Sequence, residues 1–246
     1  MSQRNSRFLN LSKKYKFLKN IYFFYNIFIR NYKYLFKSSQ FNEDKIILNL
    51  FPKKFVGNFV DIGCYHPTKY NNTYLLYKHG WNGLNIDLNP LSIELFNYLR
   101  PRDINICAAI SDKETEKKLL YTGDLSPENT IQNSHKIFLQ KKHNYKNKDI
   151  KIKSIKTVKL LKLLKKHNLN KIDFLNIDIE GHELKVLQSL DFNKIKINII
   201  CVEILNYDSI SRKRTNLIIR YLKKNGYILK YKGIVNYVFK KNEKLF

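Results

Sequence analysis

The chain has 246 residues, of which 43% are hydrophobic and 14% are aromatic. This length suits one substantial domain with an appendage, and this composition excludes a globally disordered chain. The formal net charge of +26 is compatible with a nucleic acid, with an anionic membrane or glycan, or with a compositional drift towards lysine. Nucleic acid is the least favoured partner, because no helix-turn-helix, zinc-ligand or RNA-recognition motif accompanies the charge.

Residues 1–42 contain nine Lys or Arg residues and no acid. Apolar residues recur there at helical spacing, at Phe17, Leu18, Ile21, Phe24, Tyr25 and Phe28. Two interpretations stay open: an interfacial helix whose basic flanks meet anionic lipid, or a helix packed on the following domain or on a second subunit of a homo-oligomer. We therefore expect a basic helical extension over residues 1–50, followed by one domain over residues 51–246.

Several features bear on where the protein works. The apolar stretch over residues 21–29 is only nine residues long, whereas a membrane-spanning helix needs about 20 apolar residues. The sequence begins without the pattern of a secretory signal. Its three cysteines, Cys64, Cys107 and Cys201, form no CxxC pair, which disfavours a disulfide framework and a structural zinc site. We expect a cytoplasmic protein, with peripheral contact at the inner face of the membrane as an open alternative.

From residue 54 onward, short β-rich runs alternate with helical stretches, which is typical of an α/β fold with a mostly parallel sheet. The expected strands cover residues 59–63, 83–87, 104–108, 172–178 and 197–204. The expected helices cover residues 70–79, 90–99, 157–167, 183–190 and 212–224. The middle of the chain predicts a short strand at 118–121, turns at 124–129 and a polar loop at 135–153. The end of the chain predicts an antiparallel hairpin from residues 226–231 and 235–239.

Acidic and small residues follow the first three predicted strands. They are Asp61 and Gly63 after the first strand, Asp87 after the second, and Ala109, Ser111 and Asp112 after the third. An acid at the second strand end can accept both hydroxyls of a ribose, and glycine lets the backbone approach a ligand closely. The GxGxxG pyrophosphate fingerprint is absent, so this edge favours S-adenosylmethionine over a dinucleotide. Taken singly, each residue also fits a turn cap, an exposed acid or an ordinary turn.

The densest group of titratable residues follows the predicted strand at 172–178. Asp178, Glu180, His182 and Glu183 lie within six residues, at a strand end where ligands bind in open α/β sheets. Asp178, Glu180 and His182 are candidates for the base that deprotonates a hydroxyl during methyl transfer. Glu203 ends the next apolar strand, so Asp178 and Glu203 are also candidate ligands for Mg²⁺ or a similar cation. Without a metal, the same pairing raises the pKa of one carboxylate and suits it to base catalysis.

With these segments in order, the sequence resembles the FkbM family of methyltransferases. The resemblance covers residues 55–204 and is carried by the segments 60–67, 71–74, 80–83, 85–90, 108–112, 172–183 and 202–204. It implies a Rossmann-like class I methyltransferase fold that uses S-adenosylmethionine, with Tyr65, Asn72 and Thr73 joining the cofactor-binding set. Family patterns often carry Glu at the position of Asp87, and Ser-Asn-Thr where this chain has Asn71-Asn72-Thr73.

The resemblance also implies O-methylation of sugars or of polyketide-type natural products. We expect an O-methyltransferase for a hydroxyl of a sugar, a nucleotide-sugar or a surface glycan, because a nucleotide-sugar also gives the excess Lys and Arg an anionic partner. A nucleic-acid methyltransferase is the first alternative, although the Asp/Asn-Pro-Pro-Tyr type of motif for base amines is absent. The second alternative is a non-catalytic membrane-surface protein that retains the fold.

Overall fold

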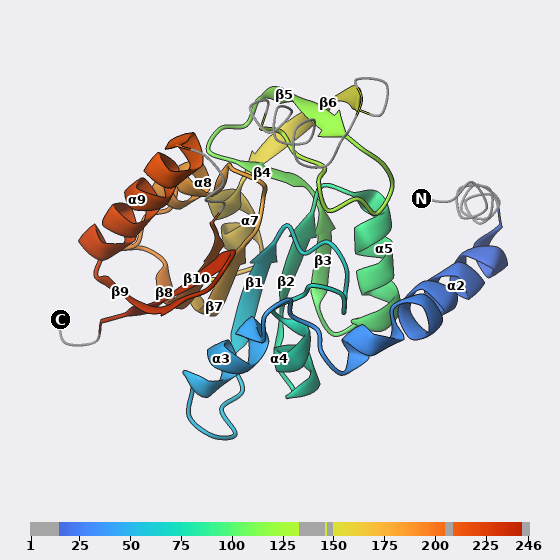
Figure 1. The fold of residues 1–246 in the computed structure, drawn as a ribbon, viewed down its shortest axis with the longest axis horizontal. Helices are drawn as coiled ribbons and strands as arrows, with labels where there is room; N and C mark the ends of the chain where they lie inside the picture. The colour runs from blue at the N-terminus through green and yellow to red at the C-terminus, as the bar shows by residue number, and fades with distance from the viewer. Residues whose placement is uncertain (1–14, 133–145, 147–149, 205–208, 243–246) are drawn as a thin grey trace.

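The computed structural model describes residues 15–132, 146, 150–204 and 209–242. Its main body is a seven-stranded sheet with the strand order β3-β2-β1-β7-β8-β10-β9 (Figure 1). A second, three-stranded sheet has the order β4-β6-β5 and lies above the main sheet in that view. The fold is therefore Rossmann-like, with a mostly parallel sheet that closes on an antiparallel hairpin, as the sequence predicts.

The parallel strands of the main sheet are apolar runs, which suits strands covered on both faces. These strands are β1 (Asn58–Ile62), β2 (Asn82–Asp87), β3 (Ile104–Cys107), β7 (Lys171–Ile177) and β8 (Lys196–Glu203). Each lies within one residue of its predicted bounds. β10 (Asn236–Lys241) pairs antiparallel with both β8 and β9 (Tyr227–Lys232), so the predicted hairpin is confirmed.

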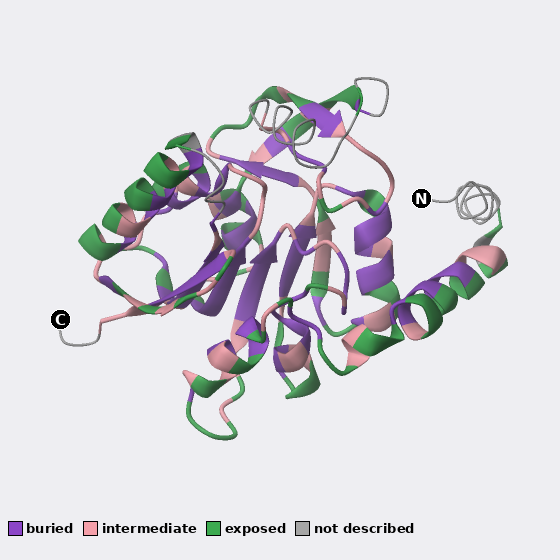
Figure 2. Cartoon of the chain, viewed as in Figure 1, coloured by how far each residue is buried: buried purple, intermediate pink, exposed green. Residues whose placement is uncertain are grey.

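Helices cover both faces of the main sheet. One face buries a large cluster that includes Val60 and Leu175 against α7 (Leu160–Lys166), α8 (Glu183–Gln188) and α9 (Ser209–Lys224). The opposite face packs Phe59 and Phe174 against Trp81, α3 (Glu43–Asn49) and α4 (Tyr74–Lys78). Figure 2 shows the strands buried between these layers. Because side chains alternate along a strand, β1, β7 and β8 each contribute to both clusters.

The middle of the chain departs from the sequence prediction. The small sheet consists of β4 (Ala109–Ser111), β5 (Glu116–Tyr121) and β6 (Lys151–Lys159). The predicted loop at 135–153 and the predicted helix start at 157 are wrong at this strand, because residues 151–159 pair with β5 and β4. The rest of that predicted loop lies largely outside the described residues. The predicted helix at 70–79 is shortened to α4, because Asn71 and Thr73 turn their side chains to a buried acid.

The first described helix packs on the main body through one face. α2 (Lys16–Phe24) continues into a π-helix, η1 (Tyr25–Arg30), and a 3₁₀ turn, η2 (Tyr32–Leu35). Tyr22, Phe23 and Ile27 are buried against Leu91 and Leu95 of α5 (Pro90–Leu99). This confirms the packed interpretation for that face. None of the helices formed by the described residues combines the length and the apolar character needed to cross a bilayer.

Candidate functional site

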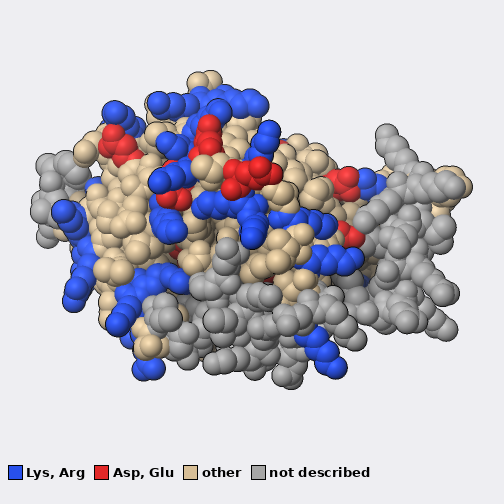
Figure 3. Space-filling view, turned by 90° about the horizontal axis from the view of Figure 1, so that it is seen from above, with Lys and Arg blue, Asp and Glu red and all other residues tan. Residues whose placement is uncertain are grey.

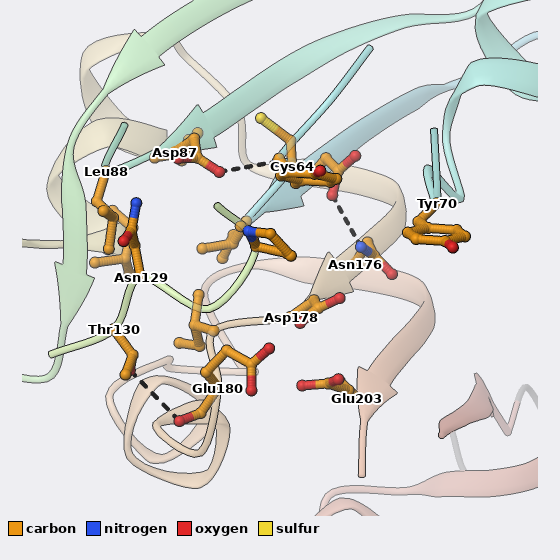
Figure 4. Close-up of a pocket in the computed structure, with 18 of the residues that line it drawn as sticks. Cys64, Tyr70, Asp87, Leu88, Asn129, Thr130, Asn176, Asp178, Glu180 and Glu203 are labelled. Atoms are coloured by element: carbon orange, nitrogen blue, oxygen red, sulfur yellow. Dashed lines mark hydrogen bonds between the residues drawn. The ribbon is translucent and has the colours of Figure 1, made fainter. Parts of the chain in front are cut away.

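A cavity of about 300 Å³ lies at the carboxyl edge of the parallel strands. Parallel strands bring their carboxyl ends to one edge, where open α/β sheets bind ligands. Figure 4 shows side chains from β1, β2, β7 and β8 converging on this space. Of the predicted site residues, those that line it are Asp61, Gly63, Tyr65, Asn72, Asp87, Ala109, Asp178, Glu180 and Glu203.

Asp87 sits at one end of the cavity. Its two carboxylate oxygens accept hydrogen bonds from the backbone N–H groups of Tyr65, at 2.8 Å, and Asn89, at 2.7 Å. These bonds fix the carboxylate at the tip of β2, while each oxygen keeps a further lone pair for a ligand hydroxyl. Burial raises the pKa of Asp87 to about 6. The carboxylate is therefore ionised at neutral pH and can accept hydrogen bonds from a ribose.

Gly63 follows β1 and lines the cavity. This position requires glycine because of a neighbouring part of the protein backbone. A Cβ at this position would lie 1.7 Å from the carbonyl oxygen of Asp178, and the φ angle is +77°. The sequence predicts that the missing side chain leaves room for the cofactor. The structure shows that it first makes room for the backbone that leaves β7.

Asp61 is almost fully buried, and its carboxylate accepts three hydrogen bonds from neighbouring side chains. Oδ1 accepts from the amide of Asn176 at 2.9 Å, and Oδ2 accepts from the hydroxyl of Thr73 at 2.8 Å and the amide of Asn71 at 3.2 Å. The buried guanidinium of Arg100 donates to Asn71 Oδ1 and Thr73 Oγ1. Asp61 and Thr73 thus hold the loop after β1 in place, and Thr73 itself is not among the residues that line the cavity.

Three carboxylates gather at the other end of the cavity. Asp178, Glu180 and Glu203 each offer an oxygen within 4.8 Å of the others, and Figure 4 shows them facing one another. They come from the ends of β7 and β8, two strands that pair in parallel. This confirms the expectation that Asp178 and Glu203 lie side by side.

Crowding of these acids shifts their protonation. Burial, followed by the charge of Asp178, raises the pKa of Glu203 well above its usual range. Burial also raises the pKa of Asp178 to about 7, while a hydrogen bond with Glu203 opposes that rise. Glu203 is therefore the partner that keeps its proton at neutral pH, and it donates that proton towards Asp178.

His182, Ser111 and Asp112 form a separate group that does not line the cavity. The Nε2 atom of His182 lies 2.9 Å from Ser111 Oγ and 3.4 Å from Asp112 Oδ1. Burial, aided by Lys117, lowers the pKa of His182 to about 4, so the imidazole is neutral. The sequence analysis expected Ser111 and Asp112 at the cofactor and His182 as a base. None of the three lines the cavity, although Ala109 and Ile110 of the same strand, β4, do.

Other lining residues escaped the sequence analysis. A loop after β5 contributes residues 126–131, and Thr130 Oγ1 lies 3.5 Å from the carbonyl of Glu180. Asn176, a polar residue inside an apolar strand, receives the amide of Asn72 at 3.1 Å. Tyr70 lines the rim and is 44% exposed. A polar residue inside an apolar strand could have identified Asn176 from the sequence, whereas no sequence pattern identifies the loop residues.

Three of the seven non-glycine residues with positive φ angles among the described residues lie at this site. Tyr65, Tyr70 and Glu180 all line the cavity and have positive φ angles of +54°, +53° and +55°. Non-glycine residues rarely adopt this region, and such residues cluster at functional sites. These backbone conformations cost free energy, and contacts with the surrounding structure hold them in place.

Comparison with known proteins decides the family. The sequence profile of the methyltransferase FkbM domain matches residues 61–229, which is more than half of the chain. The chain belongs to the FkbM methyltransferase family. A comparison with curated proteins found no match. The FkbM family implies S-adenosylmethionine as the methyl donor, and the ionised Asp87 at the tip of β2 fits its ribose.

Two solved structures were also similar to the chain. One is the "putative rRNA-methylase" from Clostridium thermocellum, with 12% identity, a TM-score of 0.40, and coverage of 81% of this chain and 93% of that one. The other is the METTL16 MTase domain, with 13% identity, a TM-score of 0.39, and coverage of 80% of this chain and 63% of that one. Likeness at this level carries no conclusion about the acceptor.

Proposed function

We propose that this FkbM methyltransferase methylates a hydroxyl of a sugar, a nucleotide-sugar or a surface glycan. The observation that carries the proposal is the placement of two kinds of acid at opposite ends of one cavity. Asp87 lies at the tip of β2, and the three carboxylates lie at the tips of β7 and β8, on the other side of β1. Strands lie about 4.8 Å apart, so the two spacings from β2 to β7 and the three from β2 to β8 separate the ends by roughly 10–14 Å. That span accommodates a nucleoside-linked methyl donor together with an acceptor.

Asp178 is the residue we assign as the base. S-adenosylmethionine, when bound, supplies a methyl group on a positively charged sulfur, and the electrons of the broken S–C bond stay on that sulfur. The acceptor oxygen gains the methyl group and loses its proton to a carboxylate oxygen of Asp178. Glu180 and Glu203 flank that carboxylate, so they hold the acceptor hydroxyl beside it. Positioning and proton acceptance together supply the rate enhancement.

The same three carboxylates also fit a divalent cation. Carboxylate oxygens are the ligands that Mg²⁺ prefers, and Glu203 Oε2 is buried without a hydrogen-bond partner among the described residues. A cation and a shared proton neutralise the same negative charge, so they exclude each other. Mg²⁺ that raises the melting temperature of the wild type, but not of Glu203→Gln, identifies the cation. An unchanged melting temperature identifies the proton.

The rim near the carboxylates suits a phosphorylated or sugar-bearing acceptor. Tyr70 packs edge-on against Tyr34, with ring centroids 5.2 Å apart, and Lys69 Nζ lies 5.0 Å from the centroid of Tyr70. An aromatic face can pack on the apolar face of a sugar ring, and a lysine attracts phosphate. Lys and Arg side chains are also spread over the face seen in Figure 3. These features support a nucleotide-sugar over a neutral acceptor.

The test is transfer of a labelled methyl group from S-adenosylmethionine to a panel of nucleotide-sugars and free sugars. We expect transfer to at least one panel member. Loss of a positioned base typically costs about 10²–10⁴-fold, so Asp178→Asn should lower kcat by that order while cofactor binding persists. The matched control is Asp112→Asn, an acid outside the cavity, which should retain the wild-type rate. Equal rates for Asp178→Asn and the wild type would remove Asp178 from the chemistry.

A further inference from the structure

α2 and the turn of η1 that follows are apolar on two opposite sides. One side, which includes Tyr22, Phe23 and Ile27, is buried on the main body. The other side carries Phe17, Ile21 and Phe24, at the spacing that aligns residues on one helix face. These three side chains are 73%, 41% and 50% exposed. Apolar helix faces are normally covered, and no partner covers this outer face among the described residues.

We propose that this outer face docks on the surface of an anionic phospholipid bilayer. We call the face formed by Phe17, Ile21 and Phe24 the outer stripe. Residues 1–42 contain nine basic residues and no acid, and Arg30, Lys33 and Lys37 are exposed just beyond α2. An apolar helix face with basic flanks enters the boundary between headgroups and acyl chains, and the cations attract anionic headgroups.

The positive charge around the outer stripe favours an anionic bilayer over other partners that would cover it. A second copy of the chain would bring an equally basic segment against this one, and like charges oppose such an interface. The described helices are too short or too polar to span a bilayer, so the contact is peripheral. Aromatic side chains such as Phe17 and Phe24 supply the apolar area that a shallow insertion buries.

The docked helix is also connected to the candidate active site. Asn26 of η1 lies with its Oδ1 atom 2.9 Å from Nε2 of His66, and His66 follows Tyr65, which lines the cavity. The proposal stands without this connection and without the proposed acceptor, since it depends only on the outer stripe and its charge.

The test is co-sedimentation of the full chain with vesicles of phosphatidylcholine alone and of equal parts phosphatidylcholine and phosphatidylglycerol. We expect sedimentation with the anionic vesicles only, weakened by added salt. Phe17→Gln, Ile21→Gln and Phe24→Gln combined should reduce vesicle affinity at least tenfold, because glutamine keeps helix propensity and removes the apolar area. The matched control combines Ile152→Gln, Leu217→Gln and Ile234→Gln, three exposed apolar residues elsewhere, and should bind like the wild type.

Two further measurements distinguish lost membrane binding from misfolding and from a change in oligomeric state. Binding of S-adenosylhomocysteine by each variant reports an intact domain, so lost sedimentation with retained binding supports the proposal. Analytical ultracentrifugation reports the oligomeric state. A wild-type dimer that the outer-stripe variant dissociates, or wild-type protein that stays in the supernatant with anionic vesicles, would overturn the proposal.

Discussion

The Asp61 carboxylate accepts a hydrogen bond from the amide of Asn176 at 2.9 Å, joining the neighbouring strands β1 and β7 inside the core. Asp61 also receives the Thr73 hydroxyl and the Asn71 amide. One buried acid therefore organises the loop that passes over the cavity floor. It positions other residues, and since it also lines the cavity, the direct cofactor contact expected from the sequence stays a prediction.

Replacing Asp61 should therefore destabilise the fold. Asp61→Ala leaves three buried donors without their acceptor, and breaking such a network costs about 2–5 kcal/mol. Urea denaturation monitored by circular dichroism measures the loss. Glu114→Ala is the control, because its ion pair with Lys162 is exposed and such pairs contribute little. Equal stability of Asp61→Ala and the control would refute the network's importance.

Gly63 gives a second test of how the cavity floor is built. Gly63→Ala places a Cβ 1.7 Å from the Asp178 carbonyl oxygen, so we expect a loss of more than about 3 kcal/mol or failure to fold. Gly80→Ala is matched to it, since Gly80 also has a positive φ angle, +88°, but its nearest neighbour would be 3.8 Å away. The control should lose only about 1–2 kcal/mol, the strain of the left-handed backbone. Similar losses would show that backbone strain, and not the clash, dominates at Gly63.

His66 should make the protein sensitive to acid. Its Nδ1 accepts the backbone N–H groups of Thr68 and Lys69, so the ring is neutral with its proton on Nε2. Burial lowers the pKa of His66 from 6.5 to about 3. Between these values the unfolded state binds more protons, and stability falls as pH falls through this window. The slope from one such residue is at most about 1.4 kcal/mol per pH unit.

The measurement is the free energy of unfolding in urea from pH 4 to pH 7. His66→Asn should flatten the slope relative to the wild type, because asparagine does not titrate there. His79→Asn is a suitable control, as His79 is an exposed helix-end residue. A slope that His66→Asn leaves unchanged would assign the acid sensitivity to other groups.

Asp87 should also make cofactor binding pH-dependent, because binding needs its deprotonated carboxylate. Burial raises its pKa to about 6, and only the carboxylate can accept both ribose hydroxyls. Affinity for S-adenosylhomocysteine should therefore rise about tenfold between pH 5 and pH 7. Isothermal titration at both pH values measures this, and Asp87→Asn should show weak binding with no such rise. The same dependence in the variant would exclude Asp87 as its source.

The sequence predicted the main sheet well because its central strands, β1, β7 and β8, are mostly buried. Runs such as residues 172–177 are apolar without a helical period, and Pro90 marks the start of α5 as observed. The lysine-rich strand β6 was missed, since its alternation is hidden among residues that also suit a solvated loop. Strand ends correctly placed Asp87 and Asp178 at the cavity. They misplaced Ser111 and Asp112, because strand pairing in the second sheet depends on contacts distant in sequence.

The central claim is that this cavity binds S-adenosylmethionine through Asp87, and isothermal titration with S-adenosylhomocysteine tests it most directly. The account predicts a dissociation constant on the order of micromolar for the wild type, weakened at least tenfold in Asp87→Ala and retained in Asp112→Ala, whose acid lies outside the cavity. A folded wild-type protein that releases no heat, or an Asp87→Ala variant that binds as tightly as the wild type, would contradict it.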